Sequence, residues 1–380
     1  MVTNGNVSKQ LGLFGIENNG MRYNTFAPQL HNLCTNRYGF EQGKIMPSRA
    51  FCSDENQGFP IILLTKHFGT FPFNHGQVGG VVATDRHGPH SHHGKDLVIV
   101  HASHVGYDRE TGDFGIYRRL QTEGNEGTST CGKLCGTLAL YLNEFDYAKR
   151  KIFLQKNGEN KVVCIDRGLL DEERQEGLFL NLSKIVGMED DKAVIVDSHS
   201  TSIAYSASKQ FLERLGDYSW KEGKGEHIGN KLSPDLFYFK RNLDGAVEGK
   251  DHIERQLLPY MSCIVASKHP ALAAATANTR IEFDRAYRSI EQSEAFKGKK
   301  VFFISGLNID ISPEEGHIFP LTKFVPWAAY FRDSDGSSHT LEQEEIISLL
   351  SNQSIENPDQ INLEDAIGME EQEQEVTVNL

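Results

Sequence analysis

The chain has 380 residues, of which 38% are hydrophobic and 24% charged, enough for one large globular unit or two smaller ones. Its net charge of −13 gathers at one end, because residues 341–380 contain eleven acidic residues and no lysine or arginine. The other 340 residues carry 39 basic and 41 acidic side chains, so the body is nearly neutral. This distribution excludes the basic footprint of a nucleic-acid-binding protein, and we expect no nucleic-acid partner.

The sequence has no run of the roughly 18 apolar residues that a membrane-spanning helix needs. The opening segment MVTNGNVSKQ also lacks the basic and apolar regions of a secretory signal. We therefore expect a cytoplasmic protein with no membrane partner. Because cytosolic thiols stay reduced, the six cysteines favour metal binding or catalysis over disulfide formation.

In chain order, the first apolar run, residues 60–64, fits either a buried strand or the start of a helix. A glycine-rich segment follows at residues 75–80. Four consecutive apolar residues at 97–100 predict a buried strand of a parallel sheet, with His101 and His104 at its carboxyl end. Ligands bind at that end of the strands in open α/β sheets.

A loop-rich segment then leads to a helix that starts near Cys131, where apolar or small residues recur at helical spacing and Ser129 or Thr130 can cap the first turn. The later segments repeat the alternation of strands and helices, which predicts an α/β protein. Strands are expected at residues 193–196 and 300–305, and helices at 206–215, 269–278 and 341–351.

Histidine is concentrated in one part of the chain: residues 67–104 hold eight of the fifteen histidines, which indicates metal or proton chemistry. His101 and His104 compete for a ligand role, because two residues three apart on an extended strand cannot share one environment. We prefer His104, which we expect just past the strand, where the chain turns into a glycine loop. Four others lie on a predicted loop, either solvated or serving in proton relay or adventitious metal binding: His87, His90, His92 and His93.

Cys52 and Cys131 are flanked by small or polar residues, which favours metal ligands over core positions. With His104 they supply two thiolates and an imidazole, a ligand set of catalytic zinc sites whose fourth position is left to water. Cys135, one helical turn after Cys131, is either a second ligand or a core residue. Asp54 either orients a metal-bound water or forms a turn. The remaining cysteines fit small buried apolar positions: Cys34, Cys164 and Cys263.

The order Cys52, Asp54, His104 and Cys131 is the zinc-site order of β-class carbonic anhydrases. Three features are closer still to the limiting-CO2-inducible (LCIB-type) proteins. These are the CSDEN segment, a histidine at a strand end followed by a glycine-rich loop with arginine, and a Ser/Thr-x-Cys-Gly helix start. Over roughly residues 45–145 the chain therefore resembles this family, a divergent branch of the β-class fold that includes theta-type carbonic anhydrases.

The resemblance implies a β-carbonic-anhydrase-like α/β fold, with a mostly parallel sheet flanked by helices, and the charge distribution adds an acidic C-terminal tail. Residues 1–335 would form a single zinc-binding catalytic domain, residues 336–380 an acidic helix and flexible tail, and the protein a homodimer. It also implies interconversion of CO2 and bicarbonate through a hydroxide on zinc held by Cys52, His104 and Cys131. Asp54 would orient that hydroxide, and water or a histidine such as His93 or His101 would carry the proton away.

One departure from the β-class pattern bears on the function. Asn56 stands where those enzymes have the arginine that pairs with the aspartate. The partner of Asp54 must then come from elsewhere, and we select Arg118 from four arginines nearby in sequence: Arg86, Arg109, Arg118 and Arg119. Two alternatives stay open. One is a catalytically silent, zinc-stabilised LCIB-type binding or assembly protein with Asp54 as fourth ligand, and the other is a zinc hydrolase acting on a larger substrate. No nucleotide cofactor is expected, since the glycine-rich segment is not G-x-G-x-x-G.

Overall fold

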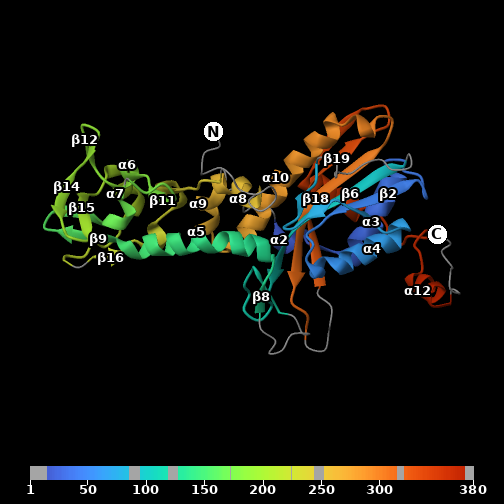
Figure 1. Ribbon diagram of the computed structural model, residues 1–380, viewed down its shortest axis with the longest axis horizontal. Helices are drawn as coiled ribbons and strands as arrows, with labels where there is room; N and C mark the ends of the chain where they lie inside the picture. Colours follow the sequence, from blue (N-terminus) through green and yellow to red (C-terminus); the bar gives the residue numbers. More distant parts are fainter. Residues whose placement is uncertain are drawn as a thin grey trace, which may run out of the picture. The chain divides into compact units, whose positions relative to one another are not determined.

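The structure is a computed structural model that describes residues 15–84, 95–118, 127–171, 173–223, 225–243, 252–314 and 321–372. Two compact units are present (Figure 1): Gly132–Ala277, here the insert unit, and Phe14–Cys131 together with Asn278–Leu380, here the sheet unit. The sequence does not predict this division. That residues 1–335 act as one catalytic domain stays a prediction.

The sheet unit is built on a sheet of order β1-β19-β18-β6-β2-β3, with β20 also paired to β19. Its strands are β1 (Met21–Arg22), β2 (Ile45–Ala50), β3 (Phe73–Asn74), β6 (Asp96–Tyr107), β18 (Val301–Ile311), β19 (Leu321–Arg332) and β20 (Ser338–Glu342). The pairings from β18 through β6 and β2 to β3 are parallel, whereas all pairings of β19 are antiparallel. The predicted α/β class is therefore confirmed, with a mixed sheet. The connection between β18 and β19 is too short for the crossover that a parallel pair needs.

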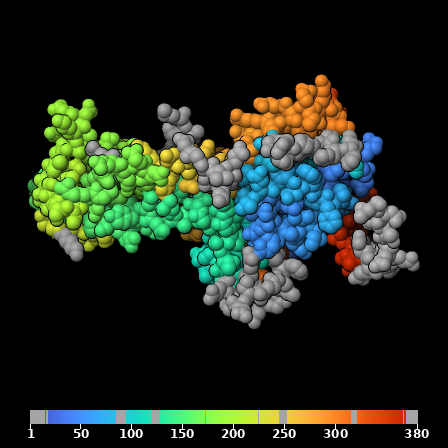
Figure 2. Space-filling model, viewed as in Figure 1, coloured from blue at the N-terminus to red at the C-terminus, as the bar shows by residue number. Residues whose placement is uncertain are grey.

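Helices flank both faces of this sheet (Figure 1). On one face lie α3 (Tyr23–Asn36), α4 (Gly58–Phe68) and α11 (Gln343–Ser351), and on the other lies α10 (Pro270–Gln292) from Asn278 onward. In Figure 2, blue to cyan residues form most of the visible face of the sheet unit, and orange residues of the α10 region border them. The short elements of this unit are α2 (Ile16–Asn19), β4 (Gly76–Gln77), β5 (Val81–Val82), β7 (Ile116–Arg118), β8 (Gly127–Ser129) and α12 (Leu363–Gln372).

The side chains of β6 alternate between the two faces, as the period of two of a β-strand requires. Val98, Val100 and Ala102 pack in the core formed with α3, α4 and α11. Leu97 and Ile99 pack instead with residues of α10. By the same alternation His101 lies on the α10 face and His104 on the α3 face, so the two histidines do not share an environment.

The strand that carries these histidines is longer than the sequence predicts. β6 spans Asp96–Tyr107 and pairs with β18 along its whole length, so His104 lies inside the strand and not just past it. The apolar run predicts a strand only as far as residue 100. The strand continues because its polar side chains are buried and hydrogen-bonded to neighbouring elements.

Other expected elements are found with shifted bounds. The apolar run at residues 60–64 belongs to α4, and the expected helix at 269–278 is the start of the longer α10. The expected C-terminal helix is α11, whose Ile346 and Leu350 are buried in the core of the sheet unit. Flexibility of the acidic tail stays a prediction. Within the described part of the chain, none of the helices combines the length and apolar character that crossing a bilayer requires.

The insert unit contains an antiparallel sheet of order β14-β15-β10-β9-β16 and a two-stranded sheet β11-β17. The expected helix at 206–215 is α7 (Lys209–Leu215), capped by Ser208, whose hydroxyl accepts a hydrogen bond from Phe211 N at 3.0 Å. The expected strand at 193–196 is divided between β13 and β14. The other elements are α5 (Gly132–Lys151), β9 (Ile152–Asn157), β10 (Asn160–Asp166), β11 (Gly177–Leu180), α6 (Leu182–Ile185), β12 (Met188–Glu189), β13 (Lys192–Ala193), β14 (Ile195–Ser198), β15 (Ser202–Ser206), β16 (Glu226–His227), β17 (Phe237–Lys240), α8 (His252–Leu257) and α9 (Met261–Val265).

Candidate metal centre

Three side chains that could bind a metal meet inside the sheet unit. Cys52 follows the end of β2, His104 lies in β6, and Cys131 directly precedes α5. One potential ligand atom from each lies within 4.8 Å of the other two, and the two Sγ atoms are 3.9 Å apart. All three residues are buried. The structure thus brings together the three residues that the sequence predicts as ligands, and the group could hold a metal ion.

His104 is oriented for a ligand role by a carboxylate on the neighbouring strand. Its Nδ1 lies 2.8 Å from Oδ2 of Asp310 in β18, and both side chains are fully buried. Because a carboxylate accepts the Nδ1 proton, the lone pair of the neutral ring is on Nε2. Nε2 is buried and has no hydrogen-bond partner in the described residues. A carboxylate on one ring nitrogen with the other left for the metal is the usual arrangement of metal-binding histidines.

Without a metal, the same surroundings favour a protonated His104. Burial opposes the charge, but the Asp310 carboxylate and the nearby sulfurs of Cys131 and Cys52 outweigh it and raise the pKa of His104 well above its usual value. A metal cation in place of this proton would be stabilised by the same negative groups around His104. The group is therefore suited to bind a positive charge.

Asp310 is itself held by a chain of buried polar side chains. Gln57 Nε2 donates to both of its carboxylate oxygens, at 3.1 and 3.0 Å, and Thr322 Oγ1 donates to Oδ1 at 3.0 Å. Asn308 Nδ2 donates to Gln57 Oε1 at 2.6 Å, and Tyr23 OH donates to Asn308 Oδ1 at 2.8 Å. Each member fixes the next, so the His104 ring has a defined orientation.

Sequence reasoning missed this network, although one signal could have found it. Asn308 and Asp310 are polar residues inside the otherwise apolar strand segment VFFISGLNIDI. A charged residue is seldom fully buried unless it is paired. Asp310 therefore stands out as a residue with a function.

The two cysteines share one proton in the metal-free group. The Sγ atoms of Cys52 and Cys131 are within hydrogen-bond distance, with either able to donate, and Cys52 Sγ accepts a hydrogen bond from Gly79 N at 3.0 Å. The hydrogen bond from Cys131, helped by His104 and Gly79, lowers the pKa of Cys52 to about 3 despite burial. The same bond raises the pKa of Cys131. The contact of the two sulfurs thus favours one thiolate beside one thiol.

Asp54 adopts the turn-forming geometry that the sequence left as an alternative. Its Oδ1 accepts a hydrogen bond from Asn56 N at 3.2 Å and caps the 3-10 turn Glu55–Gln57. Its side chain is half-buried, and burial raises the pKa of its carboxyl group. A second carboxylate oxygen is left for a ligand or water near the group, so capping and a role in the site are compatible.

No arginine of the described segments lies within ion-pair distance of Asp54. Nη1 of Arg118 lies 2.6 Å from Oε1 of Glu110, and Nη2 of Arg118 lies 3.5 Å from Oδ2 of Asp108. Arg109 pairs with Glu314. The catalytic role of Arg118 therefore stays a prediction without a contact to Asp54. The other two candidates lie outside the described residues: Arg86 and Arg119.

His101 uses both ring nitrogens away from this group. Its Nε2 donates to Gly80 O at 2.9 Å, so Nδ1, 2.7 Å from Ser305 Oγ, accepts the hydroxyl proton. Burial lowers the pKa of His101 to about 4. The ring is neutral with no nitrogen left for a metal, so the geometry selects His104. The loop histidines, including the candidate proton carrier His93, lie outside the described residues: His87, His90, His92 and His93.

Cys131, not Cys135, completes the group of potential ligands. None of the six cysteines, all of which lie in the described segments, forms a disulfide bond. The three predicted core positions are buried: Cys34, Cys164 and Cys263.

The fold and the Cys–His–Cys group define an α/β protein with a candidate metal site. No protein-family model and no curated protein sequence matches the chain. Among solved structures, it is similar to PtLCIB4, a homolog of the limiting CO2-inducible protein LCIB. The TM-score is 0.50 at 13% identity, covering 86% of this chain and 95% of that one. LCIB itself is matched with a TM-score of 0.44 at 14% identity, over 88% of this chain and 98% of the other. The predicted LCIB-type resemblance is confirmed as a likeness of fold.

Proposed function

We propose that this protein is an LCIB-type, zinc-dependent carbonic anhydrase that interconverts CO2 and bicarbonate. The observation that carries the proposal is the buried, unpartnered Nε2 of His104 beside the Sγ atoms of Cys52 and Cys131. Leaving a buried nitrogen unpaired costs about 1–3 kcal/mol, and a metal bond would remove that cost. Thiolate and imidazole ligands together favour zinc among the common divalent ions. The likeness of fold to PtLCIB4, described as a homolog of a limiting CO2-inducible protein, supports CO2 as the substrate.

Zinc with three protein ligands supplies a Lewis acid that brings the pKa of water from near 16 to about 7. The residues of the chain do the rest. Cys52 and Cys131, once both are deprotonated, balance the charge of the ion. Asp310 holds the Nδ1 proton of His104 and so keeps Nε2 available. Asp54 would accept a hydrogen bond from the water that attacks CO2 and would so orient that water.

Stopped-flow CO2 hydration on protein of measured zinc content tests this function. We expect zinc-dependent hydration in the wild type and at least a hundredfold loss in Cys52→Ala and in His104→Ala. Cys34→Ala is the matched control, because Cys34 is a buried thiol of the same unit outside the group. Stoichiometric zinc without hydration in the wild type would contradict the proposal.

A catalytically silent, zinc-stabilised protein is the second candidate, and one observation favours it. No described arginine pairs with Asp54, so no arginine of those segments holds its carboxylate away from a metal. In such a protein Asp54 would be the fourth ligand. Asp54→Asn would then weaken zinc binding, whereas in the active enzyme it would reduce hydration and leave zinc affinity nearly unchanged.

We further propose that the protein acts in the cytoplasm as a homodimer. A reducing compartment keeps the thiols of Cys52 and Cys131 available for metal. A dimer would cover part of the apolar surface between residues 59 and 78, where Phe71 is 72% and Val78 55% exposed. Sedimentation equilibrium would measure the oligomeric state, and a monomer at micromolar concentration would contradict this part of the proposal.

A further inference from the structure

The glycine-rich segment before β6 touches the metal centre through a backbone group. Gly79 N donates to Cys52 Sγ at 3.0 Å. Gly79 and Gly80 both have left-handed backbone angles, with φ of 82° and 74°. A Cβ at Gly80 would lie 2.6 Å from Ala102 O, so the segment runs directly against β6. Glycine adopts these backbone angles without steric cost, which allows the loop to bring this N–H to the sulfur.

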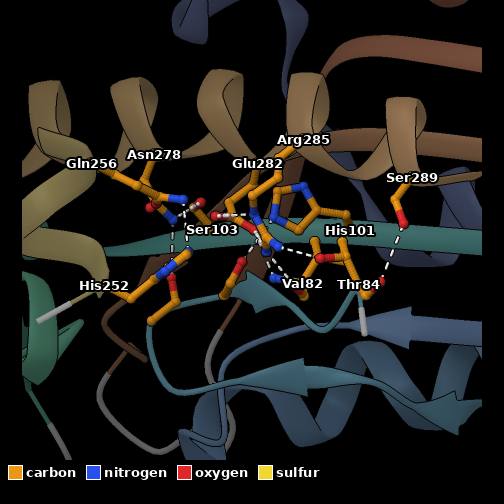
Figure 3. Close-up of polar contacts among 12 residues, drawn as sticks. Val82, Thr84, His101, Ser103, His252, Gln256, Asn278, Glu282, Arg285 and Ser289 are labelled. Atoms are coloured by element: carbon orange, nitrogen blue, oxygen red, sulfur yellow. Dashed lines mark hydrogen bonds and ion pairs between the residues drawn. The ribbon is translucent and has the colours of Figure 1, made fainter. Parts of the chain in front are cut away.

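Two charged residues of α10 hold the following part of the segment (Figure 3). Glu282 Oε2 accepts a hydrogen bond from Val82 N at 2.7 Å. Arg285 donates to Thr84 Oγ1 at 2.6 Å and also to Val82 O. The two side chains pair with each other at 2.6 Å. Backbone N–H and C=O of one loop residue are thus both bound by the same helix.

A third residue of α10 holds the glycines themselves. Asn278 Nδ2 donates to Gly79 O at 3.2 Å and to Ser103 Oγ of β6 at 2.8 Å. His101 donates from β6 to Gly80 O. Both glycine carbonyls are therefore bound, which fixes the two peptide planes that directly follow the Gly79 N–H. Figure 3 shows Asn278, Glu282 and Arg285 reaching from α10 toward this segment and β6.

Burial makes this arrangement unlike an ordinary surface ion pair. The Glu282 side chain is fully buried and that of Arg285 is 27% exposed. A buried ion pair adds little net stability, because desolvation offsets the attraction between the charges. Its best-attested use is to specify one arrangement of the groups around it. Here the arrangement specified is that of the loop next to Cys52.

We propose that Asn278, Glu282 and Arg285, here the α10 clamp, are positioning residues for the metal centre. They hold the segment Gly79–Thr84 so that the Gly79 N–H points at Cys52 Sγ and tunes its strength as a ligand. An N–H donor withdraws electron density from the sulfur, and such partners of metal ligands affect affinity strongly. The inference rests on the metal binding of the proposed function and not on CO2 hydration.

The test compares two clamp variants, Glu282→Gln and Arg285→Lys, with matched changes on the same helix. Asp284 and Arg288 also pair, at 2.9 Å, but are 55% and 61% exposed, so Asp284→Asn and Arg288→Lys are the controls. Zinc affinity is measured by competition with a chelator, and the cobalt-loaded protein is examined by absorption spectroscopy. Thermal unfolding of the metal-free proteins shows which variants fold.

We expect about tenfold weaker zinc binding in both clamp variants, because a Cys52 thiolate without its N–H donor holds more tightly the proton that zinc must displace. The thiolate-to-cobalt absorption band should also move to longer wavelength, because a sulfur without its N–H donor gives up electron density more readily. A change in stability alone would not move this band. Both controls should match the wild type.

Arg285→Lys keeps the charge next to Glu282 and loses only the two-pronged contact with Thr84 and Val82. It therefore tests the clamp even if Glu282→Gln does not fold. Folded clamp variants with wild-type zinc affinity and cobalt spectrum would overturn this inference and leave the proposed function intact. A wild type that binds no zinc would overturn both.

Discussion

The two faces of β6 differ in how completely their histidines are hydrogen-bonded. On the α10 face, His101 has a partner at each ring nitrogen, Ser305 and Gly80 O. On the α3 face, His104 has Asp310 at Nδ1 and no partner in the described residues at Nε2. Both rings are fully buried. The comparison teaches that burial alone does not select between these two histidines: the candidate ligand is the one whose unsatisfied nitrogen lies in the group with two thiols.

Substitution of His104 and of His101 should give the largest difference in zinc binding. His104→Ala should abolish stoichiometric zinc binding, because two thiols remain without the imidazole. His101→Gln should keep one zinc per chain, since His101 makes no contact with the group and Gln retains a polar side chain. Metal analysis of the purified, dialysed proteins measures both, and loss of zinc in His101→Gln with retention in His104→Ala would reverse the assignment.

The pH dependence of stability should differ in sign between the two histidines. Burial lowers the pKa of His101 to about 4. Above about pH 6.5 this histidine is neutral in both the folded and the unfolded chain, so it does not make stability depend on pH there. Between about pH 6.5 and pH 4 the histidine of the unfolded chain takes up a proton, whereas the buried His101 of the folded protein does not. The free energy of unfolding therefore falls by up to about 3 kcal/mol over this range. The pKa of His104 is raised, so its contribution is fully present below about pH 6.5 and is lost as the pH rises through the folded value.

Urea unfolding of the metal-free protein from pH 4.5 to 8 measures this difference. His101→Gln should flatten the loss of stability in acid, and His104→Gln should steepen it. If the two variants change the pH profile in the same direction, the hydrogen bonding assigned to the two faces is wrong.

Asp310, the partner of His104, and Ser305, the partner of His101, should differ in the same way in their effect on zinc affinity, but by less than the histidines themselves. Asp310→Asn should weaken zinc binding about 10- to 100-fold, because the amide cannot hold the Nδ1 proton as a carboxylate does. Ser305→Ala should leave zinc affinity unchanged and cost about 1 kcal/mol of stability, the value of one buried hydrogen bond. Zinc competition and urea unfolding on both variants test this pair, and equal zinc affinities would remove Asp310 from the site.

Several features follow from the sequence because they depend on residue type and local spacing. Cys52 and Cys131 stand out as thiols in small or polar surroundings, and an extended strand necessarily separates His101 from His104. The α/β class follows from the alternation of strand and helix patterns. These conclusions need no knowledge of which distant segments meet.

What the sequence could not reveal depends on contacts between distant segments. Asp310 and His104 meet because β6 and β18 pair in one register, 206 residues apart along the chain. The full length of β6 depends on hydrogen-bond partners that other elements supply to its polar residues. The role of the Gly79–Gly80 turn likewise depends on contacts with residues distant in sequence. For Arg118, proximity in sequence suggested Asp54, whereas the fold places it beside Glu110 and Asp108.

A crystal structure of the zinc-loaded protein, with anomalous data collected at the zinc edge, tests the central claim most directly. The account predicts one ion bonded to Cys52 Sγ and Cys131 Sγ at about 2.3 Å and to His104 Nε2 at about 2.0–2.1 Å. Zinc bound elsewhere, or no anomalous peak between these three side chains at saturating zinc, would contradict it.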